Sequence, residues 1–181
     1  AYGSVLFADI VSFTVFSTGL EAARLVRILD WMFLLHDDLA GRIGVDKIKT
    51  LGDCYVASTG LLAPATDHAA ALIKFGIGMH AMMGRLNDKF ELRGNGPFGK
   101  DLRIRVGVAS GPVVGGVVGG KKFLFDIWGT TVEEAEIMES EGIPERVQIS
   151  AATYLRAKKD DWLRFDKRDD VKLPGYDETS Y

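Results

Sequence analysis

The sequence predicts an α+β domain with a ferredoxin-like βαββαβ core, in which an antiparallel sheet carries its helices on one face. Strand-like and helix-like patterns follow one another in that order over residues 4–110, which is the order of the split βαβ fold. The chain has 181 residues, 47% of them hydrophobic, which suits one core. No repeat, linker or low-complexity tract divides the sequence, so we expect a single domain over residues 1–181.

The core elements are recognised by the spacing of their apolar residues and by the residues that interrupt them. Apolar residues at every third or fourth position mark helices, and short apolar or alternating runs mark strands. Gly44 ends the first helix, Pro64 opens the second, and Gly52 with Asp53 makes a tight turn between strands. The expected order is a strand at 4–8, a helix at 20–43, strands at 45–51 and 54–59, a helix at 64–86 and a strand at 102–109.

A C-terminal extension follows this core. Residues 110–112 (SGP) are expected to form a turn, and the Gly- and Val-rich residues 113–120 a flexible arm or ribbon. Further elements are expected as a strand at 123–127, a helix at 131–140, a strand at 147–149 and a helix at 151–157.

The composition argues against several classes of protein. The formal net charge of -3 disfavours a nucleic-acid partner. The single cysteine, Cys54, cannot form an internal disulfide or a Cys-rich zinc site, and it suits a reducing compartment. No apolar run approaches the ~20 residues that span a bilayer. We therefore expect a cytoplasmic domain with no membrane segment in this fragment. Its abrupt ends suggest a piece of a larger protein, which leaves room for a membrane anchor elsewhere.

Two aspartates are the first candidates for chemistry. Asp9 ends the first strand and Asp53 lies in the turn before the third. These strands are neighbours in the split βαβ order, so both carboxylates can project from the same end of the sheet. Hard oxygen ligands suit Mg²⁺, and paired ions can stabilise a displacement at phosphorus. Residues 10–14 then offer successive backbone N–H groups that can hold phosphate oxygens. The alternative is that Asp9 caps a turn and Asp53 is a hairpin residue.

Several segments, in order, resemble those of class III adenylyl and guanylyl cyclase catalytic domains. Residues 7–14 (FADIVSFT) resemble the first metal motif and residues 47–55 (KIKTLGDCY) the second. Residues 103–112 (RIRVGVASGP) resemble the strand that carries a phosphate-contacting arginine. Residues 125–129 (FDIWG), with 138–140 (MES), resemble the segment that reads the base. The resemblance covers nearly the whole chain and implies the class III cyclase fold.

The resemblance also implies a mechanism. Sites at the interface of a head-to-tail dimer would let the ribose 3′-oxygen attack the α-phosphorus and release pyrophosphate. Two Mg²⁺ or Mn²⁺ ions per site would be held by Asp9, Asp53 and the Ile10 carbonyl. The residues implied to bind the nucleotide are Phe13, Thr14 and Arg105 at the phosphates, Lys49, Asp126 and Ile127 at the base, and Lys172 at the triphosphate.

The implied base is adenine. Adenine N1 accepts a hydrogen bond, which suits the ammonium of Lys49, and its amino group donates one, which suits Asp126. Guanine reverses both, and such mismatches reject a substrate strongly. ATP is therefore expected, with GTP as the alternative, and a Lys49–Asp126 ion pair would be compatible with either. Arg105 can instead be a solvated strand residue. Lys172 can be a surface lysine, since the Lys-Gly pair usual in the family is missing there.

Two positions depart from the catalytic pattern. Where catalytic members carry an Asn and an Arg, this chain has Glu133 and Ile137, and loss of such a charge-stabilising donor costs about 10²–10³ in rate. The combination resembles the first, C1-type half of two-domain adenylyl cyclases, whose C2-type partner supplies the missing pair. We expect little activity from this chain alone. In that arrangement the partner would read the base, and Lys49 and Asp126 would line a degenerate second pocket.

Two other readings stay open. The first is a regulatory pseudo-cyclase that dimerises and binds a nucleotide or another effector without turnover. The second is a different two-metal nucleotidyl transferase on a similar sheet, such as a polymerase or a diguanylate cyclase. The acidic balance speaks against the polymerase, and the absence of a Gly-Gly-Asp/Glu-Glu-Phe turn speaks against the diguanylate cyclase.

Overall fold

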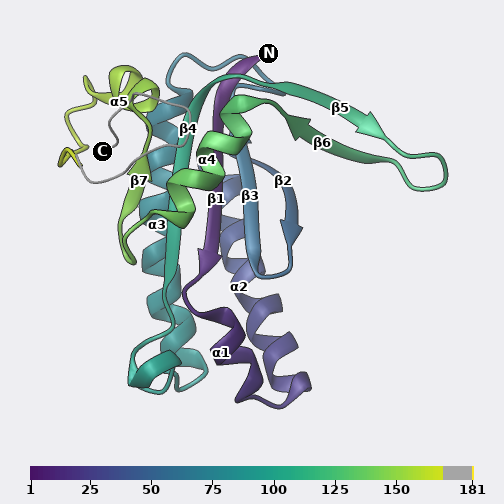
Figure 1. Cartoon of the computed structure of the whole chain (residues 1–181), viewed down its shortest axis with the longest axis vertical. Coiled ribbons are helices and arrows are strands. Elements are labelled where there is room, and N and C mark those ends of the chain that lie inside the picture. The colour runs from purple at the N-terminus through teal and green to yellow at the C-terminus, as the bar shows by residue number, and fades with distance from the viewer. Residues whose placement is uncertain (169–180) are drawn as a thin grey trace.

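The computed structural model of the chain describes residues 1–168 and 181. Residues 2–112 form the core strands and helices, and a set of mostly shorter elements follows (Figure 1). In order they are β1 (Tyr2–Ile10), α1 (Phe13–Thr18), α2 (Ala22–Ile43), β2 (Asp46–Leu51), β3 (Cys54–Thr59), α3 (His68–Lys89), the 3-10 helix η1 (Pro97–Gly99), β4 (Ile104–Pro112), β5 (Val114–Val118), β6 (Leu124–Trp128), α4 (Thr130–Ser140), β7 (Val147–Ile149) and α5 (Ala151–Ala157).

The main sheet has the strand order β2-β3-β1-β4-β7. β1 lies between β3 and β4 and is antiparallel to both. β2 pairs antiparallel with β3, and β7 adds to β4 in parallel. The first four strands, with α2 and α3, reproduce the predicted βαββαβ core, so the predicted fold class is confirmed.

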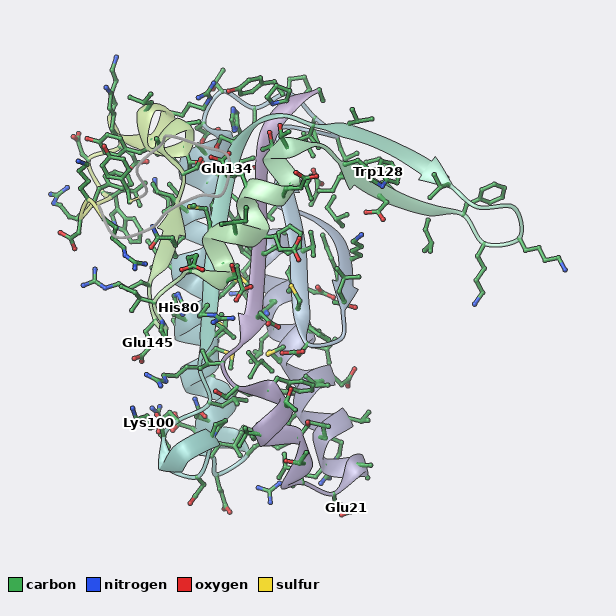
Figure 2. All side chains as sticks on the ribbon, in the orientation of Figure 1. Glu21, His80, Lys100, Trp128, Glu134 and Glu145 are labelled. Atoms are coloured by element: carbon green, nitrogen blue, oxygen red, sulfur yellow. The ribbon has the colours of Figure 1, made fainter. Side chains whose placement is uncertain are left out.

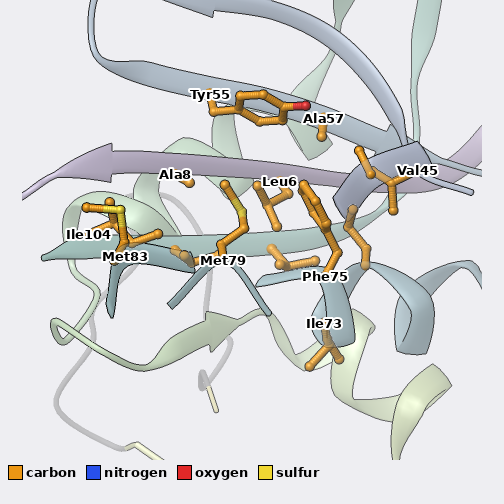
Figure 3. Close-up of a cluster of buried hydrophobic side chains, with 14 of the residues drawn as sticks. Leu6, Ala8, Val45, Tyr55, Ala57, Ile73, Phe75, Met79, Met83 and Ile104 are labelled. Atoms are coloured by element: carbon orange, nitrogen blue, oxygen red, sulfur yellow. The ribbon is translucent and has the colours of Figure 1, made fainter. Parts of the chain in front are cut away.

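The larger core lies between this sheet and the helices α2 and α3. Side chains of β1 that point to this face, such as Leu6 and Ala8, meet Phe75 and Met79 of α3 (Figure 3). Tyr55 of β3 is fully buried in the same cluster.

The helical spacing along residues 20–43 predicted Met32, His36 and Ala40 on the buried face of α2, and all three are buried. It was wrong for Val26, which is 63% exposed, and it missed Ile28, which is fully buried.

Helix α4, from the C-terminal extension, covers the opposite face of the sheet. A second apolar cluster forms there, in which Val5 and Phe7 of β1 meet Ala109 of β4 and Ala135 of α4. Gly107 marks the closest approach, because a Cβ at this position would lie 2.0 Å from the backbone nitrogen of Glu139. The two core helices share one face, as predicted, and α4 closes the other.

β5 and β6 form a separate two-stranded antiparallel ribbon that extends away from the body of the domain (Figure 1). The predicted arm over residues 113–120 is its first strand. Trp128 lies where the ribbon leaves the body (Figure 2). Val114, Val118, Leu124 and Trp128 are all exposed. Their register, Val114 opposite Trp128 and Val118 opposite Leu124, puts these four apolar side chains on one face of the ribbon.

Three local predictions differ from the structure. The short helix α1 was not predicted; Ser12, with φ of 58°, turns the chain out of β1 into it. Residues 110–112 continue β4 instead of turning, because they pair with Tyr2–Ser4 of β1. α3 begins at His68 rather than at Pro64. In residues 1–168 no helix is long and apolar enough to cross a membrane.

Candidate active site on the α4 face of the sheet

Two of the predicted site residues, Asp9 and Arg105, lie on the face of the sheet that α4 covers, near the end of β1. Asp9 and Arg105 lie directly opposite each other on β1 and β4. Successive side chains alternate between the faces of a sheet. Asp9 therefore shares its face with Phe7, and Arg105 shares it with Gly107. Both side chains thus lie on the same side of the sheet as the second apolar cluster, and not on the side of the larger core.

Asp9 and Asp53 come together as the order of strands predicted. Asp53 lies in the turn between β2 and β3, and its carboxylate accepts a hydrogen bond from the backbone N–H of Ile10 at 3.2 Å. Burial, hydrogen bonding with Asp9 and the negative charge of Asp9 raise the pKa of Asp53 to about 7. Asp53 therefore changes its protonation state near neutral pH, beside the half-buried carboxyl group of Asp9.

This donor set fits a divalent cation. Neither Asp9 nor Asp53 forms an ion pair with a cationic side chain among residues 1–168, so neither carboxyl group has a cationic partner there. Carboxylate and carbonyl oxygens are the ligands that Mg²⁺ and Mn²⁺ take in proteins. No cluster of three or more His, Cys, Asp or Glu side chains suited to a metal occurs in the described part of the chain. Further ligands would have to come from Ile10, water or a substrate.

The chain leaves the Asp9 end of β1 through α1. Ser12 precedes this six-residue helix in a left-handed conformation, so Phe13 and Thr14 form its first turn. Backbone N–H groups in a first turn have no partner inside their own helix. Thr14 is exposed and Phe13 is half-buried against the larger core. The predicted phosphate-binding segment is thus adjacent to the aspartates.

Lys49 and Asp126 form an ion pair, which was one of the predicted possibilities. The Lys49 ammonium donates to both carboxylate oxygens of Asp126 at 2.7 and 2.8 Å. A shift in register between Lys47 and Lys49 explains how they meet. Lys47 points toward α2, where it binds Asp37 at 2.7 Å; regular alternation would send Lys49 the same way. The bulge directs Lys49 to the other face, toward β6.

Asp126 is held from two sides. Burial acts to raise its pKa, but the bonds from Lys49 and from the backbone N–H of Ile127 at 2.8 Å outweigh burial and lower the pKa. Asp126 therefore stays ionised. Ile127 itself is 4% exposed and packs in the second apolar cluster, so its side chain serves to anchor the ribbon.

Glu139 of α4 belongs to the same group of residues, although no individual role was predicted for it. Its carboxylate accepts a hydrogen bond from Nε of Arg105 at 2.9 Å. Burial raises the pKa of Glu139 most. The charge of Arg105 lowers it and the charge of Asp9 raises it, and the net effect is a raised pKa. The only sequence feature that pointed to Glu139 was its place in residues 138–140 (MES), which resemble a segment of the cyclase site. Its contact with Arg105 depends on how α4 packs on β4, which spacing does not reveal.

The remaining candidates lie at the edges of this group. Burial and nearby carboxylates, Asp9 first among them, raise the pKa of Cys54 to about 12, so the thiol stays protonated and is a poor nucleophile. Glu133 is exposed on α4, and Ile137 is half-buried one turn further along. Lys172 lies outside the described residues.

The comparisons with known proteins identify the family to which the chain belongs. Residues 3–181 match the family model described as adenylate and guanylate cyclase catalytic domain. An adenylate cyclase of Mycobacterium tuberculosis is 39% identical over 178 residues, which cover 98% of this chain and 38% of that protein. The human guanylate cyclase soluble subunit beta-2 is 32% identical over 95% of this chain and 27% of its own length. The chain thus spans less than half the length of these relatives.

Solved structures show the same fold. The guanylate cyclase domain of RhGC from Catenaria anguillulae, in complex with GTP, superposes with a TM-score of 0.87 at 29% identity, covering 99% of this chain and 93% of that one. The adenylyl cyclase CyaB from P. aeruginosa gives a TM-score of 0.88 at 26% identity, covering 99% and 91%. Both kinds of cyclase are therefore among the relatives, and this chain belongs to the adenylate and guanylate cyclase catalytic domain family.

Proposed function

We propose that this domain forms 3′,5′-cyclic AMP and pyrophosphate from ATP, in a dimer with a second cyclase domain. The observation that carries the proposal is the pair of half-buried carboxyl groups, Asp9 and Asp53, in direct interaction at the end of β1. Such a pair, with no cationic partner in residues 1–168, is suited to binding divalent cations. We assign two Mg²⁺ or Mn²⁺ ions to Asp9, Asp53 and the carbonyl of Ile10.

The ions, when bound, would supply positive charge to the attacking 3′-oxygen and to the departing pyrophosphate oxygen. The chain's own residues would orient the nucleotide. Arg105 presents a permanently charged guanidinium beside Asp9, which suits phosphate oxygens. Backbone N–H groups of Phe13 and Thr14 would hold the phosphates from the other side. Lys172 is kept as a candidate contact to the triphosphate.

ATP is favoured over GTP by Lys49, Asp126 and the backbone of Ile127. The two side chains present a donor and an acceptor in the order that adenine requires, and they are already placed at 2.7 Å from each other. To bind here, adenine would have to replace the hydrogen bonds between Lys49 and Asp126 with hydrogen bonds to its own N1 and amino group. The test is turnover with both nucleotides: preferential formation of cyclic GMP would exclude this assignment.

A partner domain is favoured by two features. The first is the set of exposed apolar residues on the ribbon, Val114, Val118, Leu124 and Trp128, which are 66%, 49%, 66% and 42% exposed. Exposed apolar patches of this kind mark interaction sites. The second is the absence of the Asn and Arg at Glu133 and Ile137. We propose a C2-type partner, which would bring both groups to the Asp9 site.

The decisive experiment measures cyclic AMP and cyclic GMP formation with Mg²⁺ or Mn²⁺, for this chain alone and mixed with a C2-type domain. We expect little product alone and strong product from the mixture. Asp9→Asn and Asp53→Asn should abolish it, whereas Asp30→Asn, which removes an exposed carboxylate on α2, should leave it unchanged. Strong activity of the unmixed chain would refute the need for a partner.

A gain-of-function variant tests the same point from the other direction. Glu133→Asn with Ile137→Arg restores the two groups within one chain, so a homodimer should become active. The expected gain is about 10²–10³ in rate, the usual worth of such a charge-stabilising donor. Nucleotide binding without product, in the mixture and in this double variant alike, would instead favour the regulatory pseudo-cyclase.

A further inference from the structure

A buried ion pair joins α4 to β4 beside the aspartates. The Nε atom of Arg105 lies 2.9 Å from Oε1 of Glu139, and the side chain of Glu139 is only 9% exposed, against 31% for Arg105. Charge-assisted bonds of this geometry are about twice as strong as neutral ones. The contact is therefore a stable part of the site and not a surface pairing.

The position of Glu139 is set by backbone packing. Gly107, two residues beyond Arg105 on the same face of β4, lets α4 approach so closely that a Cβ there would be 2.0 Å from the Glu139 nitrogen and 2.5 Å from the Ala135 carbonyl oxygen. The helix and strand thus touch through their main chains. The carboxylate of Glu139 can shift only as far as its own short side chain allows.

Asp9 is a second anionic residue within reach of Arg105. The two residues are cross-strand neighbours, and directly opposite residues in an antiparallel pair have Cβ atoms about 4.5–5.5 Å apart. Opposite charges at that separation attract, yet Arg105 binds Glu139 instead. An Arg105–Asp9 pair would neutralise the carboxylate assigned to the metal and would turn the guanidinium away from any phosphate.

The bond to Glu139 uses only one edge of the guanidinium. It engages Nε, and no bond from the terminal Nη atoms of Arg105 is found in the described part of the chain. A guanidinium binds a phosphate through two parallel N–H bonds, so the free end keeps the donors that this requires. Resting on the proposed function, we propose that Glu139 is a positioning residue, which holds Arg105 off Asp9 and keeps its Nη groups directed at the triphosphate.

A positioning role and a purely electrostatic role of Glu139 predict opposite changes in anion binding. If Glu139 acted only as one more negative charge, Glu139→Gln would strengthen the binding of an anion. If it positions Arg105, the same variant should weaken it. We would titrate the full chain, in the presence of Mn²⁺, with inorganic tripolyphosphate by calorimetry, and measure Mn²⁺ binding separately by electron paramagnetic resonance.

Glu139→Gln should weaken tripolyphosphate binding about tenfold and also weaken Mn²⁺ binding, because Arg105 then pairs with Asp9. Glu136→Gln removes the same charge from an exposed position on the same helix and should change both by less than twofold. In an Arg105→Ala background, Glu139→Gln should have no further effect on either ligand. Glu139→Asp, which keeps the charge on a shorter side chain, should retain part of the binding and serves if the Gln variant does not fold.

The outcomes separate the two proposals. If the wild-type chain binds neither Mn²⁺ nor tripolyphosphate, the proposed function fails and this inference fails with it. If the wild type binds both and Arg105→Ala weakens tripolyphosphate binding, but Glu139→Gln binds as tightly or more tightly, the function stands and the positioning role is overturned. An equal loss from Glu139→Gln with and without Arg105 would also overturn it, since Glu139 would then not act through Arg105.

Discussion

The buried imidazole of His36 should make this protein lose stability as the pH falls. Its side chain on α2 is 1% exposed and packs edge-on against Tyr55, with ring centroids 5.5 Å apart. Neither ring nitrogen has a hydrogen-bond partner among the described residues. Burial lowers the pKa of His36 from 6.5 to about 3, with smaller effects from Asp37, which raises it, and from His80 and Lys47, which lower it.

The change in stability with pH follows from the difference between the pKa of His36 in the folded and in the unfolded chain. Between pH 6.5 and about 3 the unfolded chain binds a proton at His36 and the folded chain does not, so the free energy of unfolding decreases as the pH falls through that window. Well above pH 6.5 the contribution vanishes. At pH 5, which is 1.5 units below the unfolded pKa, the loss is about 2 kcal/mol.

Urea unfolding of the wild type and of His36→Leu and His36→Gln, at pH 7 and pH 5, measures this loss of stability. Every other titrating group, Asp53 included, is common to the three proteins. Both variants should lose about 2 kcal/mol less than the wild type between the two pH values. Leu should also be more stable than Gln at pH 7, because it buries no unpartnered polar group. A variant that keeps the wild-type difference between pH 7 and pH 5 would refute the reasoning.

Two further predictions concern the packing of α4 and a buried hydrogen bond. Gly107→Ala would place a Cβ 2.0 Å from the Glu139 nitrogen, so α4 must retreat, and we expect a loss of about 1–3 kcal/mol by urea unfolding. Gly41→Ala, on α2 with open space around it, should instead be neutral or stabilise by up to about 1 kcal/mol; equal effects would contradict the account of the α4 contact. Ser4→Ala removes a fully buried hydroxyl that bonds His68 at 2.7 Å, which should cost about 1–3 kcal/mol in the same assay. An unchanged midpoint would show that the buried hydroxyl is dispensable.

The core of the fold was predictable because its signals are local. The helical spacing in residues 20–43 and the tight turn at Gly52 lie in the sequence itself. The predictions that failed depended on partners distant in the chain. Residues 110–112 have the composition of a turn, yet pairing with β1 extends β4 through them. The short helix α1 has β-branched and aromatic residues, which have low helix propensity, and its start depends on the left-handed Ser12.

Some features of the candidate site could also be predicted from the sequence, and others could not. The proximity of Asp9 and Asp53 follows from the order of the strands, so the sequence was sufficient to predict it. The resemblance placed Lys49 with Asp126, but strand alternation alone would have put it on the other face, because a bulge in β2 reverses the face to which it points. Glu139 was missed for a related reason. Its contact requires α4 to lie on the face of the sheet opposite to α2 and α3, and no periodicity within α4 specifies that face.

Helices on both faces of the sheet leave β1 little freedom to change. Its side chains from Val5 to Ala8 are nearly inaccessible to water on either face, and strands flank both its edges. A polar side chain introduced on either face of this strand would be buried away from water, which costs free energy unless it finds a hydrogen-bond partner. Mutational drift in this domain should therefore concentrate at its periphery. The edge strand β2, where Lys47, Thr50 and Leu51 are exposed, can vary while β1 cannot.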